Sequence, residues 1–268
     1  MSSSGNATTF EELLDVRALP EVKGAWTGPP ASATRARAFG GHALAQAVMA
    51  SAATVPDTHV LCSVHASFVR PSAAELPSRY TVSELRDGST FGFRGVAVSQ
   101  GDQPVTMATI AWQAAGFDDS ERGQIRALPE LPPTQTLPYP APGVLTDELD
   151  LRWLDVPGGR GLWFRTRNPI GERPTVHAAV ALYVSDLWLL DTLFRSVGLR
   201  FGDRSVRSGS LDHSAWFHRP IHTGNWCYLE STAVSVTGGT GLVQAALYDS
   251  DGYRLATFAQ QAAMLPRT

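Results

Sequence analysis

The stretch Ala256-Thr257-Phe258-Ala259-Gln260-Gln261-Ala262 is a near copy of Ala108-Thr109-Ile110-Ala111-Trp112-Gln113-Ala114. In the same way, Phe217-His218-Arg219-Pro220 repeats Phe68-Val69-Arg70-Pro71. The members of the first pair lie 148 residues apart and those of the second pair 149, so the spacing is kept to within one residue. Such constancy indicates two copies of one structural unit rather than chance matches between short segments.

Each copy is predicted to contain one helix followed by an antiparallel sheet. Residues 40–54 are rich in alanine after a glycine pair, which favours a helix, and residues 61–113 alternate like strands broken by turns. Residues 176–194 have neither proline nor glycine and are apolar on most sides, so we expect a nearly enclosed helix there. Strand-like segments follow it at 211–217, 226–236, 242–248 and 253–264. A sheet wrapped around one long helix is the hot-dog arrangement, so the predicted class is α+β, a double hot dog with joined sheets.

The expected domain boundaries follow from the repeat and from one proline-rich segment. Six prolines fall between Pro129 and Pro142, which predicts an irregular connector over residues 116–160. We therefore expect an N-terminal hot-dog unit at residues 1–115 and a C-terminal unit at residues 161–268. At 268 residues the chain has the length of about two domains, given ~150 residues for each.

Composition and charge exclude several classes of function. Hydrophobic residues make up 43% of the chain, charged residues 18%, and the net charge is −3 without any run of Lys or Arg. Nucleic-acid binding needs clustered cations, so no nucleic-acid partner is expected. The first residues lack the pattern of a secretory signal, and no run of about 18 apolar residues occurs, so we expect a cytoplasmic protein without a membrane partner.

No metal or other cofactor is expected. Cys62 and Cys227 form neither a CxxC nor a zinc pattern and are expected to be reduced thiols. His213, His218 and His222 are close in sequence, but in a strand positions 213 and 218 point to opposite faces, which disfavours a shared metal.

Strand alternation selects the polar residues that would lie among apolar ones. Even-numbered positions of the last strand form an apolar face interrupted by Gln260, so Gln260 is predicted to be buried and Gln261 to point away. Thr232 shares a face with Val234 and Val236, which predicts an apolar setting for its hydroxyl. These residues could simply satisfy backbone groups at strand ends. Together with Asp212 at a strand start, however, they form an acid, a hydroxyl and an amide on neighbouring strands, which could hold one water for attack on an electrophile.

The chain resembles the bacterial acyl-CoA thioesterase II (TesB-like) family along nearly its whole length. The resemblance rests on motifs that occur in the family's order: Phe39-Gly40-Gly41-His42, Leu85-Arg86-Asp87-Gly88, Tyr183-Val184-Ser185-Asp186, residues 210–220 (SLDHSAWFHRP), Glu230-Ser231-Thr232 and Ala259-Gln260. It implies a double hot dog that hydrolyses acyl-CoA thioesters without a covalent intermediate. It also implies that Asp212, Thr232 and Gln260 orient the attacking water, with Asp212 as general base.

The backbone N–H groups of Gly41 and His42, at the start of the first helix, are the expected donors to the oxyanion of the tetrahedral intermediate. The chain departs from the family pattern at two positions. His42 stands where the family usually has glutamine, and Val184 stands where it has a small residue, so substrate preference and pH optimum cannot be carried over.

Other readings remain open at this stage. No Gly-x-Ser-x-Gly, His-Glu-x-x-His or complete Gly-x-Gly-x-x-Gly motif occurs, which disfavours serine hydrolases, zinc proteases and dinucleotide-binding enzymes. The signature of hot-dog hydratases is also missing. The alternatives are a non-hydrolytic acyl-thioester or carrier-protein binding module and a thioesterase that acts on a carrier-protein-bound acyl chain. Self-association into a homo-oligomer is expected because hot-dog sheets leave edges that commonly pair.

Overall fold

The computed structural model describes residues 7–31, 37–116, 125–134 and 145–267. The helices are α1 (Phe10–Leu14), α2 (Gly40–Ala52) and α3 (Pro174–Ser196), with a 3₁₀ turn at Thr146–Glu148. The strands of the N-terminal half are β1 (Arg17–Ala18), β2 (Ala25–Gly28), β3 (His59–Phe68), β4 (Ser78–Asp87), β5 (Phe91–Gln100) and β6 (Gln103–Ala114). Those of the C-terminal half are β7 (Leu149–Val156), β8 (Gly159–Thr166), β9 (Val206–Ser210), β10 (Asp212–Phe217), β11 (Cys227–Thr237), β12 (Thr240–Asp249) and β13 (Arg254–Pro266).

All strands of the described chain join one antiparallel sheet in the order β1-β2-β4-β5-β6-β3-β10-β13-β12-β11-β8-β7, with β9 paired to β13. The order in the first half, β2-β4-β5-β6-β3, is mirrored by β8-β11-β12-β13-β10 in the second half. The two halves meet where β3 pairs with β10, for example at Val64 and Ala215. The repeat in the sequence is therefore a repeat of topology, and the double hot dog predicted from it is confirmed.

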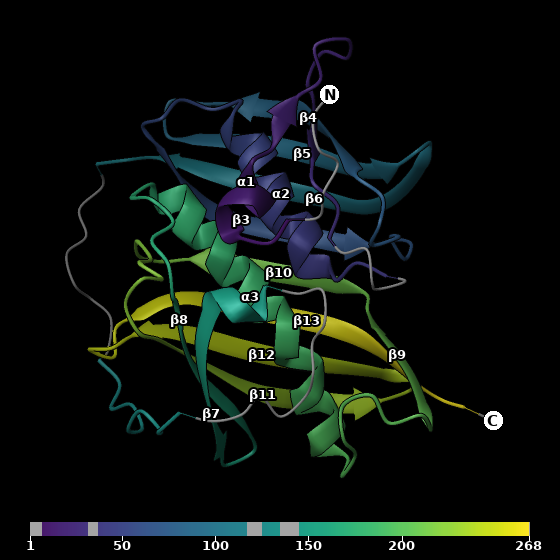
Figure 1. Cartoon of the computed structure of the whole chain (residues 1–268), viewed down its shortest axis with the longest axis vertical. Helices are drawn as coiled ribbons and strands as arrows, with labels where there is room; N and C mark the ends of the chain where they lie inside the picture. Colours follow the sequence, from purple (N-terminus) through teal and green to yellow (C-terminus); the bar gives the residue numbers. More distant parts are fainter. Residues whose placement is uncertain (1–6, 32–36, 117–124, 135–144, 268) are drawn as a thin grey trace.

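The two long helices lie together on one side of this sheet, with α3 crossing the strands of the C-terminal half (Figure 1). Helix α3 begins with a proline at its first turn and runs without an internal breaker, and sixteen of its residues are buried. By length and composition, α3 alone among the described helices would suffice to cross a membrane. Because 83% of its most apolar window is buried inside the protein, it has the character of a core helix.

The predicted connector over residues 116–160 is wrong in its second part. Strand β7 begins at Leu149 and buries Leu149, Leu151 and Trp153, while β8 begins at Gly159. This strand has apolar residues at alternate positions. It follows the proline-rich segment so closely that the composition of that segment predicts an irregular connector there as well. Residues 117–124 and 135–144 of the expected connector lie outside the described residues.

Candidate active site

The start of α2 lies against the middle of α3, and two glycines make this approach possible. A Cβ added to Gly40 would lie 2.3 Å from the ring of Phe68 and 3.0 Å from Oδ2 of Asp186. A Cβ added to Gly41 would lie 2.8 Å from the carbonyl oxygen of Tyr183. The contacts with Phe68 and with the Tyr183 carbonyl oxygen are too short for a Cβ without a shift of these neighbours, so the glycine pair allows the helix start to approach α3 closely.

The side chain of Asp186 binds the N-terminus of α2. The Gly41 N–H donates a hydrogen bond of 2.7 Å to its Oδ2, which satisfies one of the amides that a helix leaves without an internal partner. The side chain is buried on α3, and its other oxygen, Oδ1, has no hydrogen-bond partner among the described residues. Burial raises the pKa of this carboxyl, while His213, the amides of Gly41 and Gly40 and the side chain of Gln260 act in the opposite direction. The result is a buried acid with one anchored oxygen and one oxygen without a partner.

A chain of side chains from four elements meets at this acid. Gln260 on β13 is fully buried; its Nε2 donates to Oγ of Ser210 at the end of β9 over 2.6 Å, and its Oε1 lies 2.7 Å from Nδ1 of His213 on β10. An amide oxygen only accepts, so Nδ1 of His213 carries the proton in that bond. The same Nδ1 lies 3.8 Å from Oδ1 of Asp186, and Nε2 of His213 lies 3.0 Å from Oγ of Ser185 on α3. Both planar side chains, His213 and Gln260, are therefore fixed beside Asp186.

This arrangement has the parts needed to activate a water. A carboxylate oxygen without a partner can accept a proton, and a raised pKa makes the carboxylate a better base than an exposed aspartate. The Ser210 hydroxyl and the Gln260 amide, which are hydrogen-bonded to each other, can hold a water in one orientation. Among the described residues, no group of three or more His, Cys, Asp or Glu side chains is arranged to hold a metal ion.

Of the predicted acid, hydroxyl and amide, only Gln260 belongs to this cluster. Gln260 is buried and Gln261 is not, as strand alternation predicts. Thr232 is exposed, and its strand β11 is separated from β13 by the whole of β12. The prediction of an apolar setting for Thr232 is wrong because the opposite parity of β11 faces the core: Ser231 is buried and its hydroxyl lies 2.7 Å from that of Thr192.

Asp212 begins β10 next to β13, as predicted, but it does not lie in the cluster around Asp186. His213 and Ala215 of β10 are fully buried, so Asp212, with the other parity, lies on the opposite face of the strand. Its Oδ1 accepts a hydrogen bond of 2.8 Å from the backbone N–H of Gln261. Asp212 therefore secures the junction of β10 with β13, and the structure does not bring it to the face that carries Gln260.

The predicted oxyanion donors already have acceptors in this structure. The N–H of Gly41 is directed at Asp186, and that of His42 at the carbonyl oxygen of Phe39, 3.3 Å away. The ring of His42 is buried with Nε2 3.1 Å from the carbonyl oxygen of Pro29. Burial lowers the pKa of His42 to about 4, so its ring is neutral at neutral pH. His42 therefore adds no group that titrates near neutral pH.

Asp186, Ser210 and His213 were missed as site residues although signals for them exist. Ser185-Asp186 is a polar pair inside an apolar helix, and a buried acid in such a setting is rare unless it is paired or functional. Ser210 and His213 flank the predicted Asp212 within three residues of sequence. No sequence pattern, however, gives the contact of Asp186 with Gly41, which joins residues 145 positions apart.

The repeated topology defines a double hot-dog protein, and its candidate site is a buried acid held at a helix start. The model of the acyl-CoA thioesterase N-terminal domain matches residues 28–114, and that of the acyl-CoA thioesterase C-terminal domain matches residues 123–264. The chain therefore belongs to the acyl-CoA thioesterase family, a family of thioester hydrolases.

Individual relatives agree with this assignment. Acyl-CoA thioesterase 2 of Haemophilus influenzae is 27% identical over 248 residues, covering 83% of this chain and 86% of the relative. Human acyl-coenzyme A thioesterase 8 is 28% identical over 257 residues, covering 84% and 79%. The crystal structure of acyl-CoA thioesterase II TesB2 from Mycobacterium marinum superposes with a TM-score of 0.80 at 26% identity and covers 97% of this chain and 98% of that one. The resemblance inferred from the sequence motifs is confirmed.

Proposed function

We propose that this protein hydrolyses acyl-CoA thioesters to a carboxylic acid and CoA by direct attack of a water molecule. Asp186 is the general base, and Ser210 and Gln260 orient the water. The observation that carries the proposal is the buried Asp186 carboxylate, which has Oδ2 anchored by Gly41 and Oδ1 without a partner beside Gln260. The names of the relatives from Haemophilus influenzae and human support acyl-CoA as the substrate.

The proposed reaction has simple proton and bond balance. Oδ1 of Asp186 takes a proton from the water while the water oxygen bonds to the thioester carbonyl carbon. This step gives a tetrahedral intermediate. Collapse of the intermediate breaks the bond from carbon to sulfur. The proton held by Asp186 then passes to the leaving thiolate, which regenerates the carboxylate and leaves the free acid and CoA.

In this mechanism His213 is a positioning residue. Because its Nδ1 donates to Oε1 of Gln260, the amide must turn Nε2 toward Ser210. The hydroxyl of Ser210 accepts that bond and keeps its own proton available for the water. The orientation of one amide thus sets the hydrogen-bond polarity of the site.

The test measures thiol release from a panel of short, medium, long and aromatic acyl-CoAs. Asp186→Asn is expected to lower kcat by about 10²- to 10⁴-fold, the usual contribution of a general base. Asp212→Asn is the matched control, with the same chemical change on the strand next to Gln260, and should retain turnover within about twofold, since a change away from the reacting groups removes no transition-state contact. Equal loss in both variants would refute the assignment of Asp186.

No release from any CoA ester by folded wild type would favour the carrier-protein substrate or the binding module. Cytoplasmic location and self-association stay predictions.

A further inference from the structure

A cavity lies at the end of α2 and the start of α3, away from the candidate active site. Its volume is about 730 Å³, within the range of small-molecule sites. It is bounded by the end of α2, the start of α3, the start of β3, the end of β6 and the segment after β10. None of Gly41, Asp186, Ser210, His213 and Gln260 lines it.

The repeat relates this cavity to the candidate active site. Gly41 is the second residue of α2 and Asp186 the thirteenth of α3; the corresponding positions on the partner helices are Thr175 on α3 and Ala52 on α2. A shift of 148 residues relates Ser210 to Cys62 and Gln260 to Trp112. The four counterparts, Ala52, Cys62, Trp112 and Thr175, all line the cavity.

The cavity thus repeats the place of the active site without its chemistry. An alanine replaces the acid, a thiol the hydroxyl and an indole the amide. Burial raises the pKa of the Cys62 thiol, so this group is not an activated nucleophile. The indole N–H of Trp112 is already directed to the hydroxyl of Ser51 over 2.8 Å. The cavity therefore has the volume of a binding site but lacks the groups for hydrolysis.

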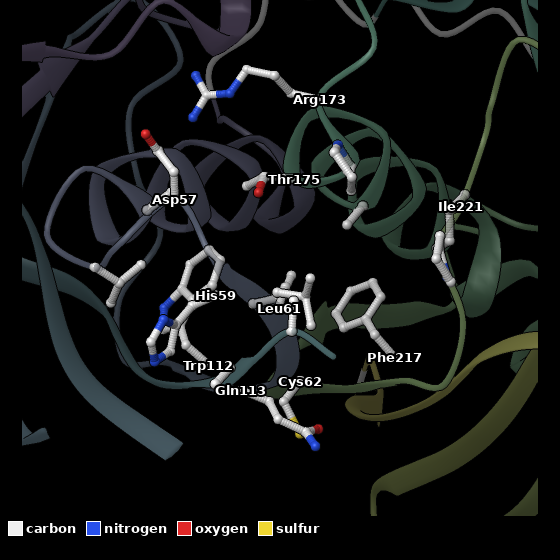
Figure 2. A pocket seen from close by; sticks show the side chains of 18 of the residues that line it. Asp57, His59, Leu61, Cys62, Trp112, Gln113, Arg173, Thr175, Phe217 and Ile221 are labelled. Atoms are coloured by element: carbon white, nitrogen blue, oxygen red, sulfur yellow. The ribbon is translucent and has the colours of Figure 1, made fainter. Parts of the chain in front are cut away.

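The residues that line the cavity indicate the chemistry of its ligand. Leu61, Trp112, Phe217 and Ile221 give the cavity an apolar wall, and Figure 2 shows Arg173 and Asp57 across from the side that carries Cys62 and Gln113. Arg219 also lines the cavity, with its guanidinium 4.9 Å from the centre of the Tyr253 ring, so the lining includes two arginines and one aspartate. Arg173 also stands at the N-terminus of α3, where the helix dipole favours an anion.

We propose that this cavity is a non-catalytic binding site for an acyl chain with an anionic head. The chain lies against Leu61, Trp112 and Phe217, and the head lies beside Arg173 at the start of α3. A free fatty carboxylate and an acyl-CoA share this chemistry. Because the site needs no acid or water, the proposal holds or fails independently of hydrolysis at Asp186.

The experiment is isothermal titration calorimetry with dodecanoate and, separately, with the non-hydrolysable thioether S-dodecyl-CoA. Arg173→Glu should weaken dodecanoate binding about tenfold or more, because a charge-assisted contact becomes a repulsion. Asp57→Asn should strengthen dodecanoate binding about threefold by removing a like charge. Arg204→Glu, an exposed arginine beyond α3, is the matched charge control and should change nothing. Ala178→Leu, which fills the cavity from α3, should abolish binding while circular dichroism reports whether it folds.

The two ligand arms distinguish the source of the acyl chain. Dodecanoate binding that responds to these variants supports the site with a free acid as ligand. A response confined to S-dodecyl-CoA supports it with acyl-CoA as ligand. Absence of both, or binding that Arg173→Glu and Asp57→Asn leave unchanged, overturns the proposal. Turnover of the same variants on a short acyl-CoA should stay near wild type, so a failure of hydrolysis would be seen separately.

Discussion

Replacement of Asp186 by asparagine should make the protein more stable while it removes turnover. The carboxylate is buried, and burial is the largest cause of its raised pKa. A buried ion costs several kcal/mol even after relaxation, whereas a buried amide costs less. Asparagine can still present an amide oxygen to the Gly41 N–H, but a charge-assisted bond becomes a neutral one, a loss of about 1 kcal/mol. The expected balance at neutral pH is a gain of about 1–3 kcal/mol in the free energy of unfolding.

The sign of the pH dependence follows from the direction of the pKa shift. The folded pKa of Asp186 lies above the unfolded one, so wild type loses stability as the pH rises through the interval between them. Below the ordinary aspartate pKa of about 4, both states are protonated and the two proteins should have the same stability. The gain of Asp186→Asn should therefore develop with rising pH and then level off.

The measurement is urea unfolding of wild type and Asp186→Asn at a series of pH values, with thiol release assayed on the same samples. Loss of about 10²- to 10⁴-fold in kcat corresponds to about 3–5 kcal/mol of transition-state stabilisation. Asp212→Asn, whose carboxylate is only partly buried, controls for the substitution itself. Asp186→Asn that destabilises the protein at all pH values would refute the reasoning. The carboxylate would then be a net stabilising anchor of α2 rather than a base kept at a cost.

Three further outcomes test other parts of the site and core. Ser210→Ala should lower kcat about 10- to 100-fold with little change in KM, because the Nε2 of Gln260 loses its acceptor and the water loses a partner; steady-state kinetics on one acyl-CoA checks this, and an effect on KM alone would contradict it. Thr232→Val should leave kcat and KM within about twofold of wild type, since the side chain is exposed on β11, and a large loss would restore Thr232 to the site. Tyr80→Phe should destabilise the protein by about 1–3 kcal/mol, measured by urea unfolding, because it leaves the buried Oε1 of Gln46 without the hydroxyl that donates to it over 2.5 Å.

The sequence predicts much of the fold because its repeat and its patterns are local. Helix α3 is uninterrupted and apolar, and Gln260 stands on a strand whose apolar parity is unambiguous. In β11 the parity is ambiguous, since Ser231 and Ala233 compete with Thr232 and Val234 for the core face. The two valines predict that Thr232, Val234 and Val236 face the core, yet Val234 is 52% exposed. When a strand has small or polar residues on both faces, its alternation does not determine which face is buried.

The site itself depends on contacts that no local pattern contains. Asp186 is one polar residue on a helix buried on nearly all sides, so helical periodicity does not say which neighbour it meets. Its partner is a backbone N–H of the other repeat, and a backbone group leaves no trace in the sequence except the glycines that let it approach. The motifs carried the family resemblance correctly, but choosing among the acids within them required the tertiary structure.

The repeat also explains why only one of the two related positions carries an acid. Asp186 faces a helix start made of Gly40 and Gly41, whose amides are unobstructed and offset part of the cost of burying a carboxylate. The counterpart position, Ala52, lines a cavity together with Pro174 and Thr175 at the start of α3. Proline has no N–H to donate, and threonine places a side chain where Gly41 has none. A carboxylate at the half-buried position 52 would have the Thr175 N–H but none from Pro174, whereas the amides of both Gly41 and Gly40 stabilise Asp186, so the same fold favours a base in one half and a cavity without one in the other.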